Sequence, residues 1–149
     1  MTGLLWPLLG VLAGGFIAIQ APVNAELSRG LGLPVAAAAA SVLSGAVILA
    51  AVTAFVTQAQ GVSLSWRVPA PWLFVVGGAM GAAYVTSAIL LVPRLGAAAT
   101  MAFIVAGQLV VGMLLDRIGF MGLPVQEFSV GRIAGAAMLL GGALLIRLY

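Results

Sequence analysis

The chain lacks cysteine, histidine and lysine, and its charge comes from six arginines and three acidic residues among 149. Without thiolate or imidazole groups we expect no disulfide, no cysteine nucleophile, no histidine base and no zinc or copper site. So few ionisable groups also leave the chain poorly equipped for acid–base or covalent catalysis. The sequence therefore predicts a protein that is not an enzyme and that carries neither a metal nor another cofactor.

Polar surface is equally scarce, since 6% of the residues are charged, 64% are hydrophobic and the mean hydropathy is +1.27. A helix that crosses a bilayer needs about 20 largely apolar residues. Such segments occur five times, at residues 3–27, 34–56, 71–92, 95–115 and 130–148. The gaps between them are too short for a second domain. We therefore expect one all-α integral membrane domain over residues 1–149, with five transmembrane helices and the lipid bilayer as its first partner.

Two other readings of the composition are less favoured. The pI of about 10.7 comes from six scattered arginines, which form no basic stripe of the kind that binds nucleic acid. The first apolar segment has no basic residue before it and is too long for the core of a signal peptide, so we expect it to be retained.

One stretch of the first segment is unusually polar. It reads Gln20-Ala-Pro22-Val-Asn24-Ala-Glu26-Leu-Ser28-Arg29. In a helix Gln20 and Asn24 lie on one face, and Pro22 between them has no N–H to donate. This pattern favours the wall of a polar cavity. The alternative is the frayed end of the first membrane helix, with Asn24, Glu26 and Ser28 already among the lipid headgroups.

Two later segments each carry a polar side chain at membrane depth. Tyr84 lies in the third segment, and its hydroxyl needs either a carbonyl of a neighbouring helix or a ligand as its partner. Gln108 lies near the middle of the fourth segment, where an unpaired amide would cost several kcal/mol. It must therefore face protein or water, and we take Gln20, Asn24, Tyr84 and Gln108 as candidate substrate-binding residues.

The acidic residues lie near the ends of the predicted helices. Glu26 and Arg29 are three residues apart and of opposite charge, so we expect them to pair. Asp116 ends the fourth segment, where an aspartate serves more often as a helix-end contact or an arginine's partner than as a proton carrier. Glu26 and Asp116 are thus candidate coupling or helix-end acids.

The fifth segment has polar side chains only near its two ends. Gly131 and Gly135 are four residues apart, a spacing that lets two membrane helices approach closely. We expect this face to pack against another helix, within the protomer or in a dimer.

Arginines are divided equally between the two sides of the membrane. Five spans place Arg67, Arg117 and Arg132 on one side and Arg29, Arg94 and Arg147 on the other. The orientation of a membrane protein follows the difference in Lys and Arg between the loops on its two sides. Because that difference is zero here, the sequence favours neither orientation. Copies inserted both ways would form an inverted pair, which reproduces the inverted repeats on which many transporters build alternating access.

Several short motifs, taken in order, resemble the YdcZ-like family of the drug/metabolite transporter superfamily. They are Pro22-Val-Asn24, Tyr84, Val92-Pro-Arg-Leu-Gly96, Ala106-Gly-Gln108 and Leu115-Asp-Arg-Ile-Gly119. The resemblance covers the whole chain, and the last two motifs are its most specific parts. Members of that family often have histidine after the aspartate, where this chain has Arg117.

The resemblance implies a bacterial, multi-pass inner membrane protein that works as an antiparallel homodimer, or with a homologous partner of opposite orientation. Ten helices would then surround a central cavity, with the first, third and fourth of each protomer lining it and the fifth outside. The function implied is alternating-access transport of a small molecule. Because no acid lies at mid-span and the candidate lining consists of amides and a phenol, we expect a neutral or zwitterionic solute, or one with a polar head and an apolar body. The alternative is a non-transporting membrane subunit or assembly partner.

Overall fold

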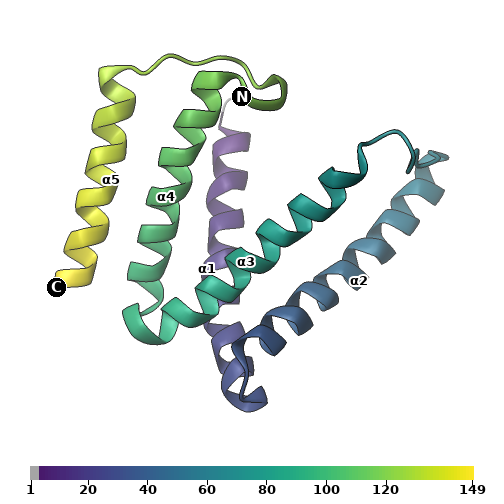
Figure 1. The fold of residues 1–149 in the computed structure, drawn as a ribbon, viewed down its shortest axis with the longest axis horizontal. Helices are drawn as coiled ribbons and strands as arrows, with labels where there is room; N and C mark the ends of the chain where they lie inside the picture. The colour runs from purple at the N-terminus through teal and green to yellow at the C-terminus, as the bar shows by residue number, and fades with distance from the viewer. Residues whose placement is uncertain (1–3) are drawn as a thin grey trace. The chain divides into compact units, whose positions relative to one another are not determined.

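The computed structural model describes residues 4–149, so residue 3, the start of the first predicted span, lies outside them. The elements are α1 (Leu5–Leu31), α2 (Pro34–Gln60), α3 (Pro71–Leu95), α4 (Ala97–Ile118), the 3-10 helix η1 (Phe120–Gly122) and α5 (Val130–Leu148). Figure 1 shows their order along the chain. The five α-helices are long and apolar enough to cross a membrane, which confirms the predicted all-α fold with five spanning helices.

Four of these helices continue past the apolar segments that predicted them, by three residues in α3 and α4 and by four in α1 and α2. The first runs on to Leu31 instead of residue 27, and the second to Gln60 instead of residue 56. Hydropathy marks only the part of a helix that suits hydrocarbon, whereas backbone hydrogen bonding continues until a residue ends it. In both helices that residue is a glycine with positive φ, Gly32 and Gly61.

Contacts divide the chain into two compact units, residues 1–91 and 92–149. In the first unit α1 packs along α2, and the start of α2 meets the end of α3. The core there consists of Ala37, Ala38, Val85 and Ile89, with Tyr84 packed against it. Alanines at this junction let the helix backbones approach closely.

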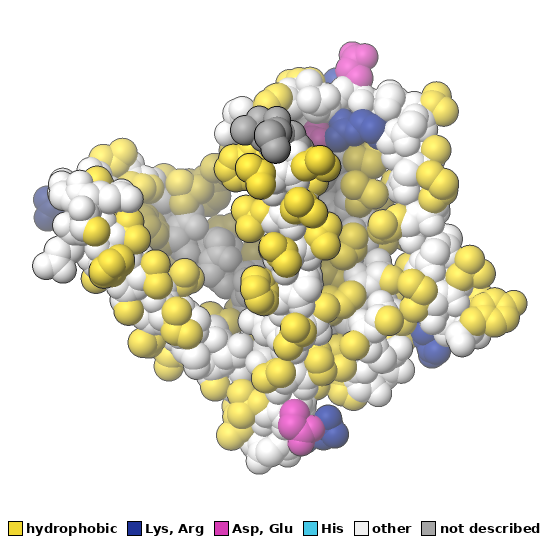
Figure 2. Space-filling view, turned by 180° about the vertical axis from the view of Figure 1, so that it is seen from behind, with side chains coloured by type: hydrophobic (Ala, Val, Ile, Leu, Met, Phe, Trp, Pro, Cys, Tyr) yellow, Lys and Arg dark blue, Asp and Glu magenta, His cyan; other side chains and the backbone are white. Residues whose placement is uncertain are grey.

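In the second unit α4 and α5 lie side by side and antiparallel (Figure 1). Ala106 and Met113 of α4 and Ala143 of α5 are buried. Most other side chains are exposed to what would be lipid or a partner chain. Figure 2 shows hydrophobic side chains over the helices and charged ones at their ends, as expected for a protein in a bilayer.

A short turn joins α1 to α2. Gly32 has φ +74°, and its N–H donates to the Ser28 carbonyl at 2.9 Å, closing the last turn of α1. Leu33 is extended and Pro34 opens α2, where its missing N–H costs nothing. The sequence Gly30-Leu-Gly32-Leu-Pro34 therefore forms the stop, turn and start that its glycines and proline predict.

Replacing Gly32 with alanine should destabilise the protein by about 1 kcal/mol, because a Cβ is strained at positive φ. Gly30 is the matched control, since it is helical and an added Cβ would meet nothing within 4 Å. Gly30→Ala should leave the stability unchanged or raise it slightly. Unfolding of both variants in detergent micelles, followed by circular dichroism, measures the difference. Equal stability of the two variants would contradict this account of the turn.

Candidate functional site

The polar stretch of α1 is a packed part of the helix. Ala21, Asn24, Ala25 and Ser28 are buried and recur at helical spacing, so they form one face. Asn24 is only 5% exposed. The helix continues through Pro22 to Leu31, so the stretch is not a frayed end.

Two glutamines lie at the centres of their helices with exposed side chains. Gln20 is the sixteenth of 27 residues in α1, and Gln108 is the twelfth of 22 in α4. Both are exposed to whatever surrounds the single chain. Gln20 is thus at the edge of the buried α1 face, whereas Asn24, one turn later, is within it. The amides of Gln20 and Asn24, which helical spacing places near one another, therefore differ in environment, since one is exposed and the other is buried.

Two hydroxyl groups are shielded but have no hydrogen-bond partner among the described residues. One is the Tyr84 hydroxyl, on the half-buried side chain at the α2–α3 core. The other belongs to Thr100, whose side chain is fully buried near the start of α4. A buried hydroxyl without a partner costs about 1–3 kcal/mol, so each is available to a water or a polar ligand. Thr100 was not among the site residues predicted from the sequence. Its hydroxyl in an otherwise apolar segment was the signal that could have identified it.

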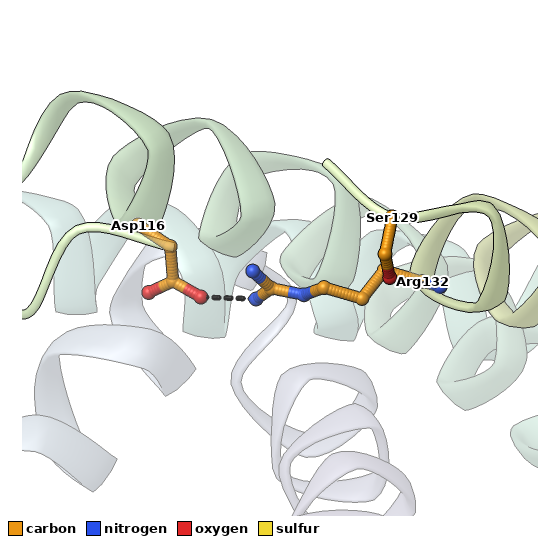
Figure 3. Close-up of polar contacts among 3 residues, drawn as sticks. All are labelled: Asp116, Ser129 and Arg132. Carbon is orange, nitrogen blue, oxygen red and sulfur yellow. Dashed lines mark hydrogen bonds and ion pairs between the residues drawn. The ribbon is translucent and has the colours of Figure 1, made fainter. Parts of the chain in front are cut away.

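Asp116 connects α4 to α5. Its carboxylate accepts a hydrogen bond from the Arg132 guanidinium and forms an ion pair with it (Figure 3). The two side chains are about one third exposed, at 32% and 31%. The main-chain carbonyl of Asp116 also accepts from the N–H groups of Gly119 at 3.3 Å and Gln126 at 3.0 Å. One residue therefore holds the end of α4, the turn after it and the start of α5.

The position of Arg132 follows from the start of α5. Ser129 is extended, and its hydroxyl accepts a hydrogen bond from the Arg132 N–H at 3.2 Å, so it caps the helix. This places Arg132 in the first turn, close to the end of the antiparallel α4. The sequence left open which arginine would pair with Asp116. Ser129, a residue typical of helix starts, three positions before Arg132 was the signal that could have placed Arg132 in the first turn of α5.

Glu26 and Arg29 pair as expected, with 2.6 Å between the carboxylate and guanidinium atoms. Both side chains are 71% exposed and belong to the same helix, so this pair contributes little to stability. Among the described residues it is Asp116, not Glu26, whose ion pair joins two helices.

The two glycines of α5 have open space around them. A Cβ added at Gly135 would meet nothing within 4 Å, and one at Gly131 would meet only the Ser129 hydroxyl at 4.0 Å. No helix of the same protomer approaches closely there within residues 4–149. The packing role assigned to this pair, within the protomer or in a dimer, therefore stays a prediction.

The candidate binding residues belong to both units. Gln20, Asn24 and Tyr84 are in the first, and Gln108 is in the second with Asp116. Their assembly around one cavity stays a prediction. Residues 4–149 hold no group of three or more acidic, histidine or cysteine side chains that could bind a metal ion.

The arrangement of five spanning helices with these polar positions can be compared with known proteins. The family described as "Putative inner membrane exporter, YdcZ" matches residues 5–145, which is 141 of the 149 residues. The chain belongs to the YdcZ family. The resemblance that the short motifs indicated is thereby confirmed.

A curated relative is the inner membrane protein YdcZ of Escherichia coli (strain K12), which is 36% identical over 75 residues. The aligned part is 50% of this chain and 50% of that protein, so the match spans half the length of each. No solved structure matches the chain. With its five apolar helices, this YdcZ family member is a bacterial, multi-pass protein of the inner membrane, and export is the activity that the family's description names for its members.

Removing the Asp116–Arg132 pair should loosen the contact between α4 and α5. Asp116→Asn and Arg132→Gln should each lower the free energy of unfolding by about 1–2 kcal/mol, the range for partly exposed charge-assisted hydrogen bonds. The double variant should cost less than the sum of the two, because each single change already breaks the same bond. Unfolding of all three in bicelles measures this coupling.

Glu26→Gln is the control, because it breaks an ion pair within one exposed helix and should change stability by less than about 0.5 kcal/mol. Additive effects of Asp116→Asn and Arg132→Gln would show that the pair does not couple the two helices.

Proposed function

We propose that two copies of this chain, inserted in opposite orientations, form a small-molecule transporter whose central cavity is lined by Gln20, Asn24, Tyr84 and Gln108. One observation carries the proposal: two amides at the centres of membrane helices are exposed on the single chain. An amide facing hydrocarbon without a partner costs several kcal/mol. A second protomer removes that cost if it covers these helix faces and leaves a water-filled cavity, because the amides then form hydrogen bonds with water.

The remaining exposed surface supports pairing. Gly77, Gly78 and Gly81 of α3 have no neighbour within 4 Å of an added Cβ, and neither do Gly10 and Gly14 of α1. Glycines at small-residue spacing let a second set of helices approach these backbones closely. Gly131 and Gly135 on α5 offer a further face of the same kind to the partner.

The equal division of arginines supports the inverted arrangement. With five spans, each side of the membrane receives three arginines, so neither orientation is favoured. An inverted homodimer, or a dimer with an oppositely oriented homologue, has a two-fold axis in the membrane plane, the symmetry on which many transporters build alternating access. The cavity would then open to one side and, after the two halves rock, to the other.

The lining also limits the substrate. Three amides and a phenol can donate and accept hydrogen bonds but carry no charge, so they suit a neutral or zwitterionic solute. Asp116 is held by Arg132 at the helix end, and Glu26 is paired with Arg29. We therefore assign both acids to the helix ends and not to the solute, and the family's description favours export as the direction.

The first test concerns orientation. A cysteine placed at position 1 or at position 149 of this cysteine-free chain should be labelled by an impermeant maleimide from outside the cell in a fraction of molecules in each case. Two lysines added in residues 63–69 should fix the orientation and abolish function, and an oppositely biased copy should restore it. Labelling of one terminus and never of the other would exclude the homodimer.

The second test concerns the site. Gln108→Leu keeps the side-chain volume but removes the amide, so solutes that raise the melting temperature of the wild-type dimer should no longer do so. The control is Gln58→Leu, an exposed glutamine at the end of α2 outside the proposed cavity. A thermal-shift screen with neutral and zwitterionic solutes, followed by counterflow in proteoliposomes for each hit, measures both binding and transport.

If Gln108 has only a structural role, Gln108→Leu should lower the melting temperature or dimer yield without any solute. Full binding and transport by a well-folded Gln108→Leu dimer would remove this residue from the site. Absence of any wild-type transport, with a dry interface between the amides, would favour a non-transporting subunit.

A further inference from the structure

An apolar groove runs between α4 and α5 in the second unit. Met101, Ala102 and Val105 line it from α4, and Leu139, Gly142, Ala143 and Ile146 line it from α5. It encloses about 350 Å³, the space of about twelve water molecules at their liquid volume of about 30 Å³ each. The groove exists because Ala102, Gly142 and Ala143 have little or no side chain where two spanning helices lie side by side.

The lining excludes two kinds of occupant. None of the seven side chains carries a hydrogen-bonding group, so nothing there would orient a polar solute. A whole helix is about 10–12 Å across with its side chains and would lie over the groove instead of entering it. A single hydrocarbon chain has the polarity and the width that the groove accepts.

A basic residue directly follows the groove-lining residues of α5 in the sequence. On α5 the lining residues recur at helical spacing, and Arg147, four residues after Ala143, continues the same face. Arg147 is exposed in the last turn of the helix, and within residues 4–149 it forms no ion pair with a carboxylate. From Leu139 to Ile146 the groove extends about 10 Å along the helix axis, toward the end of α5 that carries Arg147.

We propose that this groove binds one acyl chain of an anionic phospholipid, with the lipid phosphate on Arg147. The apolar lining holds the tail, and the guanidinium recognises the phosphate by charge-assisted hydrogen bonds. Basic positions beside crevices between membrane helices are suited to anionic headgroups. The site is separate from the proposed transport cavity and does not depend on it.

The chain offers a matched pair of variants for the test. Gly142 lines the groove and Gly141 does not, and a Cβ added at either would meet nothing within 4 Å. Gly142→Leu should fill the groove, whereas Gly141→Leu makes the same change of residue on a neighbouring face. For the charge, Arg147→Gln is compared with Arg67→Gln, an exposed arginine in the α2–α3 loop.

Native mass spectrometry of the delipidated, detergent-solubilised protein, titrated with phosphatidylglycerol and phosphatidylcholine of the same chains, measures binding. Wild type, Gly141→Leu and Arg67→Gln should bind one phosphatidylglycerol per protomer about fivefold more tightly than phosphatidylcholine, the preference expected of one arginine at a membrane surface. Gly142→Leu should lose this lipid, and Arg147→Gln should bind both lipids equally. If Gly142→Leu fails to fold, Ala102→Leu fills the same groove from α4.

Equal phosphatidylglycerol binding by folded Gly142→Leu and Gly141→Leu would overturn the tail assignment. An unchanged lipid preference in Arg147→Gln would overturn the headgroup assignment. Loss of dimer content in Gly142→Leu with unchanged lipid binding would show that the groove contacts a second copy of the chain, which also overturns the proposal.

Discussion

The structure depends on one constraint, which is that a polar group in hydrocarbon must have a partner. Backbone groups satisfy it by forming five helices, and the ends of those helices are closed by glycines at positive φ and by the Ser129 cap. Side chains satisfy it in different ways. The Asp116 carboxylate has the Arg132 guanidinium, whereas the amides of Gln20 and Gln108 are exposed at mid-span on the single chain. The first arrangement is complete within the described chain, and the second leaves two amides that need a partner, which is the basis of the proposed dimer.

Much of this could be predicted from the sequence, because the signals were local. Apolar length predicts the five spans, Gly30 to Pro34 predict the first turn, and the spacing of Glu26 and Arg29 predicts their ion pair. The ends of α1 and α2 could not be predicted from hydropathy, since backbone hydrogen bonding continues past the point where side chains become polar. The Arg132 partner of Asp116 was not identified because the two are 16 residues apart, and their meeting depends on how α4 and α5 pack.

The candidate site was less accessible to sequence reasoning than the fold. Gln20 and Asn24 share a helix face by spacing, but only the packing of α1 shows that Asn24 is buried and Gln20 is exposed. Thr100 resembles any other hydroxyl in an apolar segment, although its side chain is fully buried without a partner for its oxygen. Periodicity gives the direction of a side chain around one helix, whereas burial depends on the neighbouring helices that the chain brings to it.

The two ends of the α4–α5 pair are built differently. Near Asp116 an ion pair joins α4 to α5, while farther along the pair Ala102, Gly142 and Ala143 are small and leave an apolar groove between the helices. Because the ion pair ties the helices at the Asp116 end, a tilt about that end would displace the groove end of the pair. A helix of 22 residues is about 33 Å long, so a tilt of about 5° would move its far end by about 3 Å.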